Sequence, residues 1–179
     1  MEETIQLHDK KFKKFLDRNE IQKVVSEIAE RINHDYSDRT PTFLIVLKGA
    51  ILFAADLLRN IKIRCRIEVI SAKSYGSEME SSGTVKLKSI EDNFHGKDII
   101  IIEDIIDSGL TLKTLTEKIQ TYQPNSVECS AILSKPSARK VNVEVKYTGI
   151  EIPELFVVGY GLDYAELGRE LADIYILSE

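Results

Sequence analysis

The sequence is poor in the residues that mark several protein classes. Its 179 residues include two cysteines, Cys65 and Cys129, and three scattered histidines, His8, His34 and His95. Cysteines this far apart exclude a disulfide framework, and no CxxC pair or metal-ligand spacing indicates structural zinc. No apolar run approaches the roughly 18 residues of a membrane span, and no N-terminal segment resembles a signal peptide. We therefore expect a soluble protein of the cytoplasm that contacts no membrane.

The chain also lacks tryptophan and has no excess of positive charge. Its 24 lysine and arginine residues face 29 aspartate and glutamate residues, a formal net charge of −5. A net acidic chain is a poor candidate for non-specific binding of nucleic acid. Hydrophobic residues make up 43% and charged residues 30%, which excludes a disordered polyelectrolyte. The length predicts a single domain over residues 1–179.

Apolar residues recur along the chain with two different spacings. The spacing of an amphipathic helix is found over residues 20–33, 50–58 and 112–122. Apolar runs typical of strands are found over residues 43–47, 61–69, 99–102, 127–133, 155–158 and 174–177. The strict alternation over 61–69 predicts a strand with one face in water. This order of elements predicts an α/β fold with a mostly parallel central sheet flanked by helices.

Two parts of the chain do not follow this pattern. The first 20 residues carry no motif that we can interpret. Residues 72–97 are rich in small and polar side chains, and loops this long inside a domain are uncommon and are often lids or binding loops. The segment over about 72–86 has too little apolar surface to stay packed, so we expect a mobile loop there.

The most informative stretch runs from Ile99 to Thr111 and reads IIIIEDIIDSGLT. Its four isoleucines suit a strand buried on both faces, which ends in the carboxylates Glu103 and Asp104. A turn of small residues follows from Asp107, and a helix begins there. Such a loop, beyond the carboxyl end of a parallel strand, offers backbone N–H groups to a phosphate. The carboxylates only accept hydrogen bonds, so they suit sugar hydroxyls or hydrated Mg²⁺ instead.

Taken singly, the residues of this stretch have a structural explanation. Asp107 or Ser108 is typical of a helix N-cap, and an acid pair is typical of a solvated strand end. Their combination after a fully apolar strand favours a ligand site. The site is neither a P-loop nor a dinucleotide fingerprint, because GxxxxGK[ST] and GxGxxG are both absent.

The stretch Ile99–Thr111 resembles the binding loop for phosphoribosyl pyrophosphate in the type I phosphoribosyltransferases. That loop reads as an apolar run, two acids, two apolar residues and Asp-[Ser/Thr]-Gly-x-Thr. Further blocks resemble the members of the family that act on hypoxanthine and guanine. These blocks are Leu47–Ala50, Lys73–Gly76, Ser134–Pro136 and Phe156–Tyr164, and the resemblance spans about residues 43–177. It implies the α/β fold above, with a small C-terminal hood over the base site.

Enzymes of this kind transfer ribose 5-phosphate from phosphoribosyl pyrophosphate to a purine and release pyrophosphate, with Mg²⁺. The residues that the resemblance assigns to the 5′-phosphate are Asp107, Ser108, Gly109, Leu110 and Thr111. Those that it assigns to the pyrophosphate are Lys48, Gly49, Ser74, Tyr75 and Arg169. It places one Mg²⁺ and the ribose hydroxyls at Glu103 and Asp104, and a second Mg²⁺ at Asp163. Taken alone, Lys48, Asp163 and Arg169 also fit a surface lysine, a turn residue and a solvated helix charge. In the family the peptide that corresponds to Leu47–Lys48 can be cis.

The purine pocket can be interpreted from hydrogen-bonding capacity. Lys135 donates only, so it satisfies a 6-oxo group and not a 6-amino group. Hypoxanthine and guanine should bind and adenine should be rejected. By resemblance, Phe156 stacks on the base, although a core strand residue is its other explanation. Val157 and Asp163 would lie near the base edge, and Asp107 would exchange a proton at N7 as the catalytic acid or base.

Two further functions keep the same motifs. One is an enzyme of the same fold that acts on xanthine, and the other is a non-catalytic regulator that binds nucleotide or RNA. An RNA reader should show a basic face with interleaved aromatics, whereas this chain is acidic and carries Asp107, Lys135 and Asp163 together. A purine salvage enzyme that makes IMP or GMP is therefore favoured. Because the family is usually dimeric or tetrameric, the resemblance also implies a homodimer or homotetramer.

Overall fold

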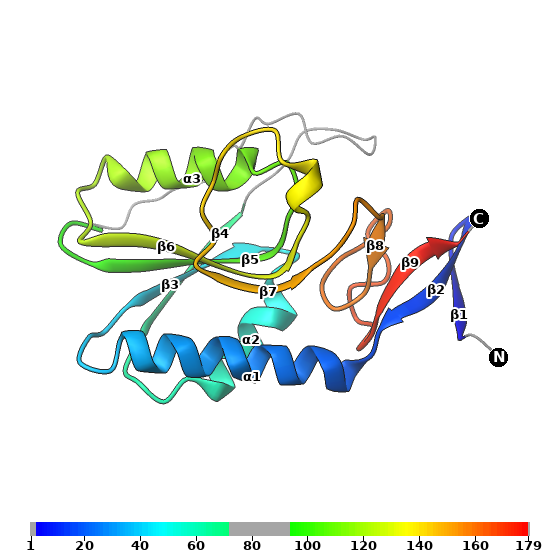
Figure 1. Cartoon of the computed structure of the whole chain (residues 1–179), viewed down its shortest axis with the longest axis horizontal. Coiled ribbons are helices and arrows are strands. Elements are labelled where there is room, and N and C mark those ends of the chain that lie inside the picture. Colours follow the sequence, from blue (N-terminus) through cyan, green and yellow to red (C-terminus); the bar gives the residue numbers. More distant parts are fainter. Residues whose placement is uncertain (1–2, 72–93, 179) are drawn as a thin grey trace.

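The computed structural model describes residues 3–71 and 94–178 of the chain (Figure 1). Ser74, Tyr75 and the loop expected over 72–86 lie outside the described residues. The helices of the described part are α1 (Arg18–Asp35), α2 (Ile51–Asn60), α3 (Leu110–Gln120) and the short 3-10 helix η1 (Pro136–Ala138). None of these helices is long and apolar enough to cross a membrane.

A sheet of five parallel strands forms the centre of the fold, in the order β4-β3-β5-β6-β7. The strands are β3 (Thr42–Leu47), β4 (Arg66–Ser71), β5 (Asp98–Ile106), β6 (Ser126–Ser134) and β7 (Tyr147–Glu151). Residues Ile99–Ile102 of the middle strand are at most 1% exposed, as expected for a run buried on both faces. The predicted α/β fold with a parallel sheet is confirmed, although β7 was not predicted.

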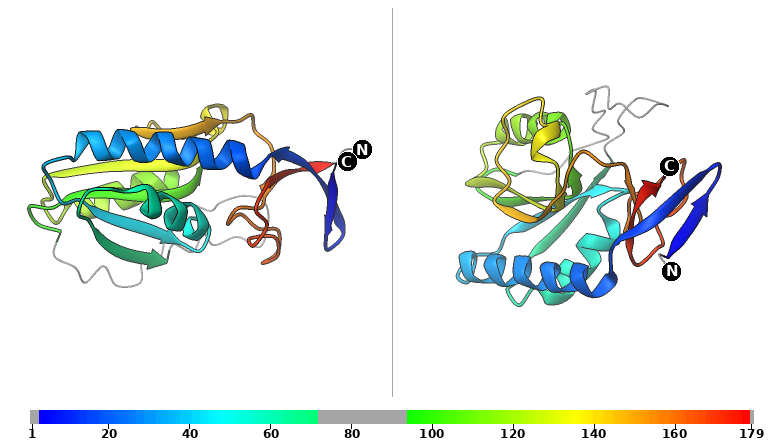
Figure 2. Two further views of the ribbon diagram at one scale, coloured as in Figure 1. Left: turned by 90° about the horizontal axis from the view of Figure 1, so that it is seen from below. Right: turned by 45° about the vertical axis from the view of Figure 1, so that its right-hand side comes forward.

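Helices cover both faces of this sheet. In Figures 1 and 2, α1 and α2 lie on one face and α3 lies on the other. The core on the first face includes Ile21, Val25, Ile28, Phe53 and Leu57. The core on the second face includes Leu112, Leu115 and Ile119. Each fully buried side chain of this size contributes about 1.5–3 kcal/mol relative to an exposed one, so both helical faces hold the sheet in place.

The two central strands separate at their carboxyl ends. β3 and β5 pair from Thr42 with Ile99 to Ile45 with Ile102 and not beyond. After that point β3 leads into α2 on one face, whereas β5 stays paired with β6 and leads into α3 on the other. A change of connection direction of this kind opens a crevice at the carboxyl ends of the strands, where α/β proteins bind ligands.

A second, antiparallel sheet forms the hood at one end of the molecule (Figure 1). Its strands, in the order β1-β2-β9-β8, are β1 (Thr4–Leu7), β2 (Lys10–Leu16), β9 (Ile174–Ser178) and β8 (Val157–Val158). The hood is therefore built from both ends of the chain and is not only C-terminal. The N-terminal hairpin was missed because lysines surround Phe12, which is fully buried against Val158 and Tyr175.

The strand predicted over 61–69 is wrong in its bounds and in its buried face. β4 begins at Arg66, and Ile67 and Val69 are 53% and 57% exposed. The alternation before Arg66 belongs to an irregular connection, in which Ile61 and Ile63 are half-buried against the first core. β4 is an edge strand of the sheet, so the neighbouring elements do not cover its apolar side chains as they cover those of β5.

Candidate active site

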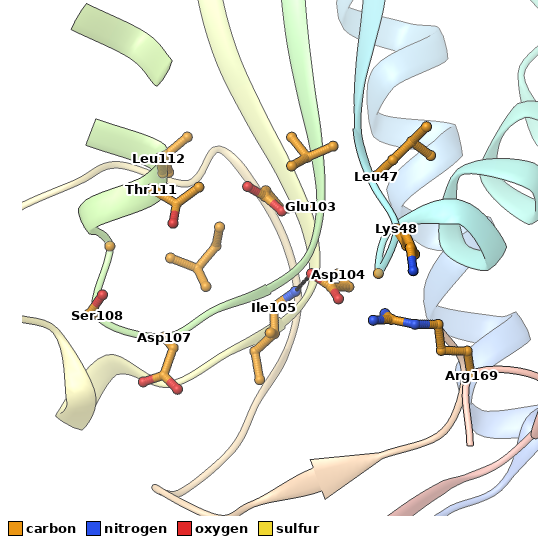
Figure 3. A pocket seen from close by; sticks show the side chains of 14 residues that line it. Leu47, Lys48, Glu103, Asp104, Ile105, Asp107, Ser108, Thr111, Leu112 and Arg169 are labelled. Carbon is orange, nitrogen blue, oxygen red and sulfur yellow. Dashed lines mark hydrogen bonds between the residues drawn. The ribbon is translucent and has the colours of Figure 1, made fainter. Parts of the chain in front are cut away.

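A cavity of about 260 Å³ opens between the separated ends of β3 and β5 (Figure 3). Three segments line it: the loop after β3, the end of β5 with the loop into α3, and the hood residue Arg169. The predicted site residues that line it are Lys48, Gly49, Glu103, Asp104, Asp107, Ser108, Gly109, Thr111 and Arg169. The fold thus brings together residues from three distant stretches of the sequence.

The acid pair lies inside β5 and not after its end, because β5 stays paired with β6 as far as Ile106. Successive strand residues point to opposite faces, so the two carboxyls project apart (Figure 3). Glu103 is only 6% exposed, and burial, with the charge of Asp104, raises its pKa well above the ordinary value. Burial raises the pKa of Asp104 as well, against the lowering effects of the Ile105 N–H and of Arg169. A cation or donor hydroxyls would stabilise these carboxylates.

The loop after β3 lies directly against Asp104. A Cβ atom on Gly49 would be 1.6 Å from Asp104 Oδ2, so the close approach requires glycine at this position. The Leu47–Lys48 peptide is cis, the conformation that the resemblance allowed.

The loop from Asp107 to Thr111 leads into α3, and Asp107, Ser108, Gly109 and Thr111 line the cavity. The N-cap residue of α3 is Gly109, with a φ of +79° and no side-chain cap, so Asp107 does not cap the helix. Ser108 Oγ accepts a long hydrogen bond of 3.4 Å from the Leu110 N–H. The first N–H groups of a helix have no partner inside it and carry the positive end of the dipole. This loop therefore suits an anion, although Leu110 itself does not line the cavity.

The two basic residues predicted to bind pyrophosphate, Lys48 and Arg169, lie across the cavity from this loop. Both form ion pairs with carboxylates of the hood. Lys48 Nζ lies 2.7 Å from Glu166 Oε2, and Arg169 Nη2 lies 2.6 Å from Asp163 Oδ1. Asp163 Oδ2 also accepts a hydrogen bond from the Glu166 N–H over 2.8 Å. Sequence reasoning missed Glu166, because nothing in its local pattern shows that the hood brings it to Lys48. Exposed ion pairs contribute about 0–1 kcal/mol, so an anionic ligand can replace Glu166 at little cost.

Lys135 and Asp107 form an ion pair beside the cavity. Lys135 Nζ lies 3.0 Å from Asp107 Oδ2, and their side chains are 9% and 52% exposed. The Lys135 N–H donates to the Ile106 carbonyl over 2.9 Å, so the adjacent ends of β5 and β6 set this pair. The buried lysine is thus held next to an accessible carboxylate.

The other expected purine contacts do not line the cavity. Phe156 packs against Phe12 and Tyr164, with ring centroids 6.3 and 5.9 Å apart. Val157 is 6% exposed in β8, where it pairs with Ile176. Lys135 and Asp163 reach the cavity only through their partners Asp107 and Arg169.

Few side chains at the cavity could coordinate a metal ion. No group of three or more His, Cys, Asp or Glu side chains in residues 3–71 and 94–178 could hold a metal ion by itself. Glu103 and Asp104 are therefore not joined by Asp163, whose two oxygens are engaged by Arg169 and the Glu166 N–H. Mg²⁺ is commonly held by one or two carboxylates together with substrate oxygens, and Glu103 and Asp104, which project apart, each offer one carboxylate to this cavity.

Fold and site together define an α/β protein with a cavity suited to a phosphorylated ligand at the separated carboxyl ends of a parallel sheet. Comparison with known families agrees, since residues 12–165 match the phosphoribosyl transferase domain. The chain belongs to the phosphoribosyltransferase family.

Named relatives cover nearly the same length. The hypoxanthine-guanine phosphoribosyltransferase of Bacillus subtilis strain 168 is 43% identical over 166 residues, 92% of each chain. That of Dictyostelium discoideum is 43% identical over 165 residues, 89% of this chain and 92% of its own. The crystal structure of a hypoxanthine-guanine phosphoribosyltransferase of Bacillus anthracis, with HEPES in its active site, is 42% identical. It superposes with a TM-score of 0.86 over 92% of this chain and 98% of its own.

Proposed function

We propose that this chain transfers ribose 5-phosphate from phosphoribosyl pyrophosphate to hypoxanthine or guanine, yielding IMP or GMP and pyrophosphate. The observation that carries the proposal is the Lys135–Asp107 pair, with Nζ and Oδ2 only 3.0 Å apart beside the anion-binding loop. O6 and N7 lie side by side on one edge of a 6-oxopurine; both are acceptors once N9 is substituted, and the free base can carry its proton at N7. A donor and a proton-exchanging carboxyl at this separation can address both atoms. The names of the relatives, which are similar over most of both chains, support the same substrates.

The two phosphorylated ends of the substrate bind on opposite sides of the cavity. The 5′-phosphate binds the loop Asp107–Thr111, and the pyrophosphate binds Lys48, Gly49 and Arg169 after it displaces the hood carboxylates. Breaking the bond to pyrophosphate develops positive charge on the ribose, as in glycoside chemistry. Glu103 and Asp104 lie in this cavity, and their carboxylates hold the ribose hydroxyls.

Proton transfer falls to Asp107 because it is the accessible carboxyl next to Lys135. As the purine N9 bonds to the ribose, Asp107 takes the proton at N7 and acts as the general base. Lys135 donates to O6 throughout, which orients the base. Adenine places a donor at that point, so the lysine rejects it.

Mg²⁺ is the proposed metal, held by Glu103 and Asp104 with substrate oxygens, and by Asp163 for a second ion once Arg169 has turned to the pyrophosphate. When bound, Mg²⁺ neutralises charge on the leaving pyrophosphate. Burial raises the pKa values of both carboxyls, and a cation bound beside them would stabilise their charged forms. The phosphorylated substrate is too charged to cross a bilayer, which supports a cytoplasmic location. We adopt a homodimer or homotetramer from the resemblance.

A turnover assay on a panel of bases tests the proposed function. Phosphoribosyl pyrophosphate and Mg²⁺ are supplied with hypoxanthine, guanine, xanthine or adenine, and nucleotide formation is followed by chromatography. We expect IMP and GMP formation and no AMP above background. Faster turnover of xanthine would identify the enzyme for that base, and binding without turnover would identify a nucleotide sensor. Adenine used as well as hypoxanthine would contradict the role of Lys135.

A further inference from the structure

A second polar cluster lies outside the candidate active site, against the hood segment that carries Arg169. Asp56 Oδ2, from α2, accepts hydrogen bonds from Gln22 Nε2 over 2.5 Å and from the Tyr160 hydroxyl over 2.9 Å. Arg59 Nη1 lies 3.2 Å from Asp56 Oδ1. These side chains line a cleft of about 410 Å³ between α1, α2 and the hood. The cluster therefore joins the hood to α1 and α2, the helices on one face of the parallel sheet.

Tyr160 has a backbone conformation that non-glycine residues rarely adopt. Its φ is +51°, and its backbone forms the tip of a tight turn closed by hydrogen bonds of 3.0 and 3.1 Å between Gly159 and Leu162. The side chain is only 4% exposed and belongs to the core beneath α1 and α2. Such a conformation persists where the surroundings enforce it. The buried ring and the hydrogen bond to Asp56 fix the position of this turn.

The next residue of the turn touches the pyrophosphate side of the candidate active site. A Cβ atom on Gly161 would lie 2.0 Å from the Gly49 carbonyl oxygen, so the turn rests directly on the loop after β3. The Gly161 N–H donates to the Arg169 carbonyl over 2.9 Å, and Arg169 Nη1 donates to the Gly161 carbonyl over 2.8 Å. A displacement of this turn would therefore move Arg169 and the Gly49 loop together.

We propose that Tyr160 and Asp56 are positioning residues for the pyrophosphate side of the active site. α2 begins at Ile51, directly after the loop that contains Gly49, so Asp56 and the loop belong to one continuous segment. The Tyr160 hydrogen bond attaches the turn beside Arg169 to that same segment. The inference rests on the proposed function, because it takes this side of the cavity to hold pyrophosphate. The pair that addresses the purine in the proposed function, Lys135 and Asp107, follows the ends of β6 and β5, so purine binding should be less sensitive to the Tyr160 hydrogen bond.

Tyr160→Phe removes the hydroxyl and keeps the ring in the core. The matched control is Tyr147→Phe, because the Tyr147 hydroxyl also donates to an aspartate, Asp35, over 2.9 Å and the residue is fully buried. Asp35 is the last residue of α1, at the end away from the hood. Both variants lose a similar hydrogen bond, so a merely structural effect should appear equally in both melting temperatures.

We expect Tyr160→Phe to raise the KM for phosphoribosyl pyrophosphate about tenfold, which corresponds to about 1.4 kcal/mol. Its kcat and its KM for hypoxanthine should stay within about twofold of the wild type, and Tyr147→Phe should leave all three constants unchanged. In a double-mutant cycle, Asp56→Ala should add no further rise in KM to Tyr160→Phe, because both act through the same bond. Equal KM values for the two tyrosine variants would overturn the proposal, as would a parallel rise in both substrate KM values.

Failure of the proposed function would be visible separately, as a wild-type protein that turns over neither purine. Calorimetric titration with inorganic pyrophosphate and Mg²⁺ then tests the positioning role without turnover. Weaker pyrophosphate binding by Tyr160→Phe than by Tyr147→Phe supports the proposal, and equal binding refutes it.

Discussion

The contact between Gly49 and Asp104 makes a single methyl group a sharp test of the active-site geometry. The φ of Gly49 lies outside the left-handed region, so alanine fits the backbone and only the new Cβ matters. That Cβ would be 1.6 Å from Asp104 Oδ2, whereas ordinary contact begins at 3.4 Å. The carboxylate oxygen would have to move by the difference, about 1.8 Å, or the loop would have to withdraw from β5.

Either movement displaces a group to which the proposed function assigns a role. Asp104 Oδ1 accepts a hydrogen bond from the Ile105 N–H over 2.9 Å, which a rotated carboxylate would lose. A misplacement of about 1 Å can reduce the rate about 10²-fold, so we expect kcat/KM of Gly49→Ala to fall by at least that factor. Overpacking should lower the free energy of unfolding by about 1–3 kcal/mol.

Steady-state kinetics and urea unfolding measure the two effects, with Gly96→Ala as the control. Gly96 has a φ of +67° and nothing within 4 Å of its added Cβ, so alanine there strains the backbone without a collision. The control should lose about 1–2 kcal/mol of stability and keep full activity. If Gly49→Ala keeps kcat/KM within twofold of the wild type, the position of Asp104 is not critical and the reasoning is refuted.

Four further predictions concern single side chains. Asp107→Asn should lower kcat about 10²–10⁴-fold in steady-state assays, and unchanged turnover would leave Asp107 only a structural role. Lys135→Met should raise the KM for hypoxanthine more than the KM for phosphoribosyl pyrophosphate; equal changes would contradict a base-specific role. Glu166→Gln removes the counter-ion of Lys48, so pyrophosphate should bind up to about fivefold more tightly in low-salt calorimetry, and weaker binding would contradict the exchange. Hydrogen bonds from His34 and Tyr147 lower the pKa of Asp35 from 3.8 to about 2, so it stabilises the fold above pH 3.8 and loses that contribution as the pH falls towards 2. Urea unfolding of Asp35→Asn should lack this acid-dependent loss, and an unaltered pH profile would count against it.

The order of elements could be predicted because burial on both faces leaves a clear pattern. The run Ile99–Ile102 is apolar throughout, which is typical of a strand buried on both faces. The periodic stripe over 20–33 lies within α1. The same reasoning failed where the apolar pattern of the sequence does not match the burial of the side chains. In β4 the alternating Ile67 and Val69 are exposed at a sheet edge, and in β2 one buried Phe12 among lysines gives no detectable alternation.

The candidate site could be predicted where its residues are consecutive. The loop into α3 is continuous in the sequence, so its residue types and spacing already indicate an anion site. The contacts from Glu166 to Lys48 and from Tyr160 to Asp56 span more than 100 positions and depend on how the hood docks. Local patterns carry no information on such approaches, and the positive φ of Tyr160 is not indicated by its residue type.

The pairing of β2 with β9 determines when the hood can fold during synthesis of the chain. Lys11 lies opposite Ser178, and Lys13 lies opposite Ile176, so β2 is translated long before the strand with which it pairs. The parallel sheet and its helices can condense while synthesis continues, but β2 lacks its long-range partner until β9 has emerged from the ribosome. The hood segment with Arg169 and Asp163 is translated only shortly before β9. A nascent chain that ends before β9 would therefore contain the complete loop Asp107–Thr111 and an incomplete hood.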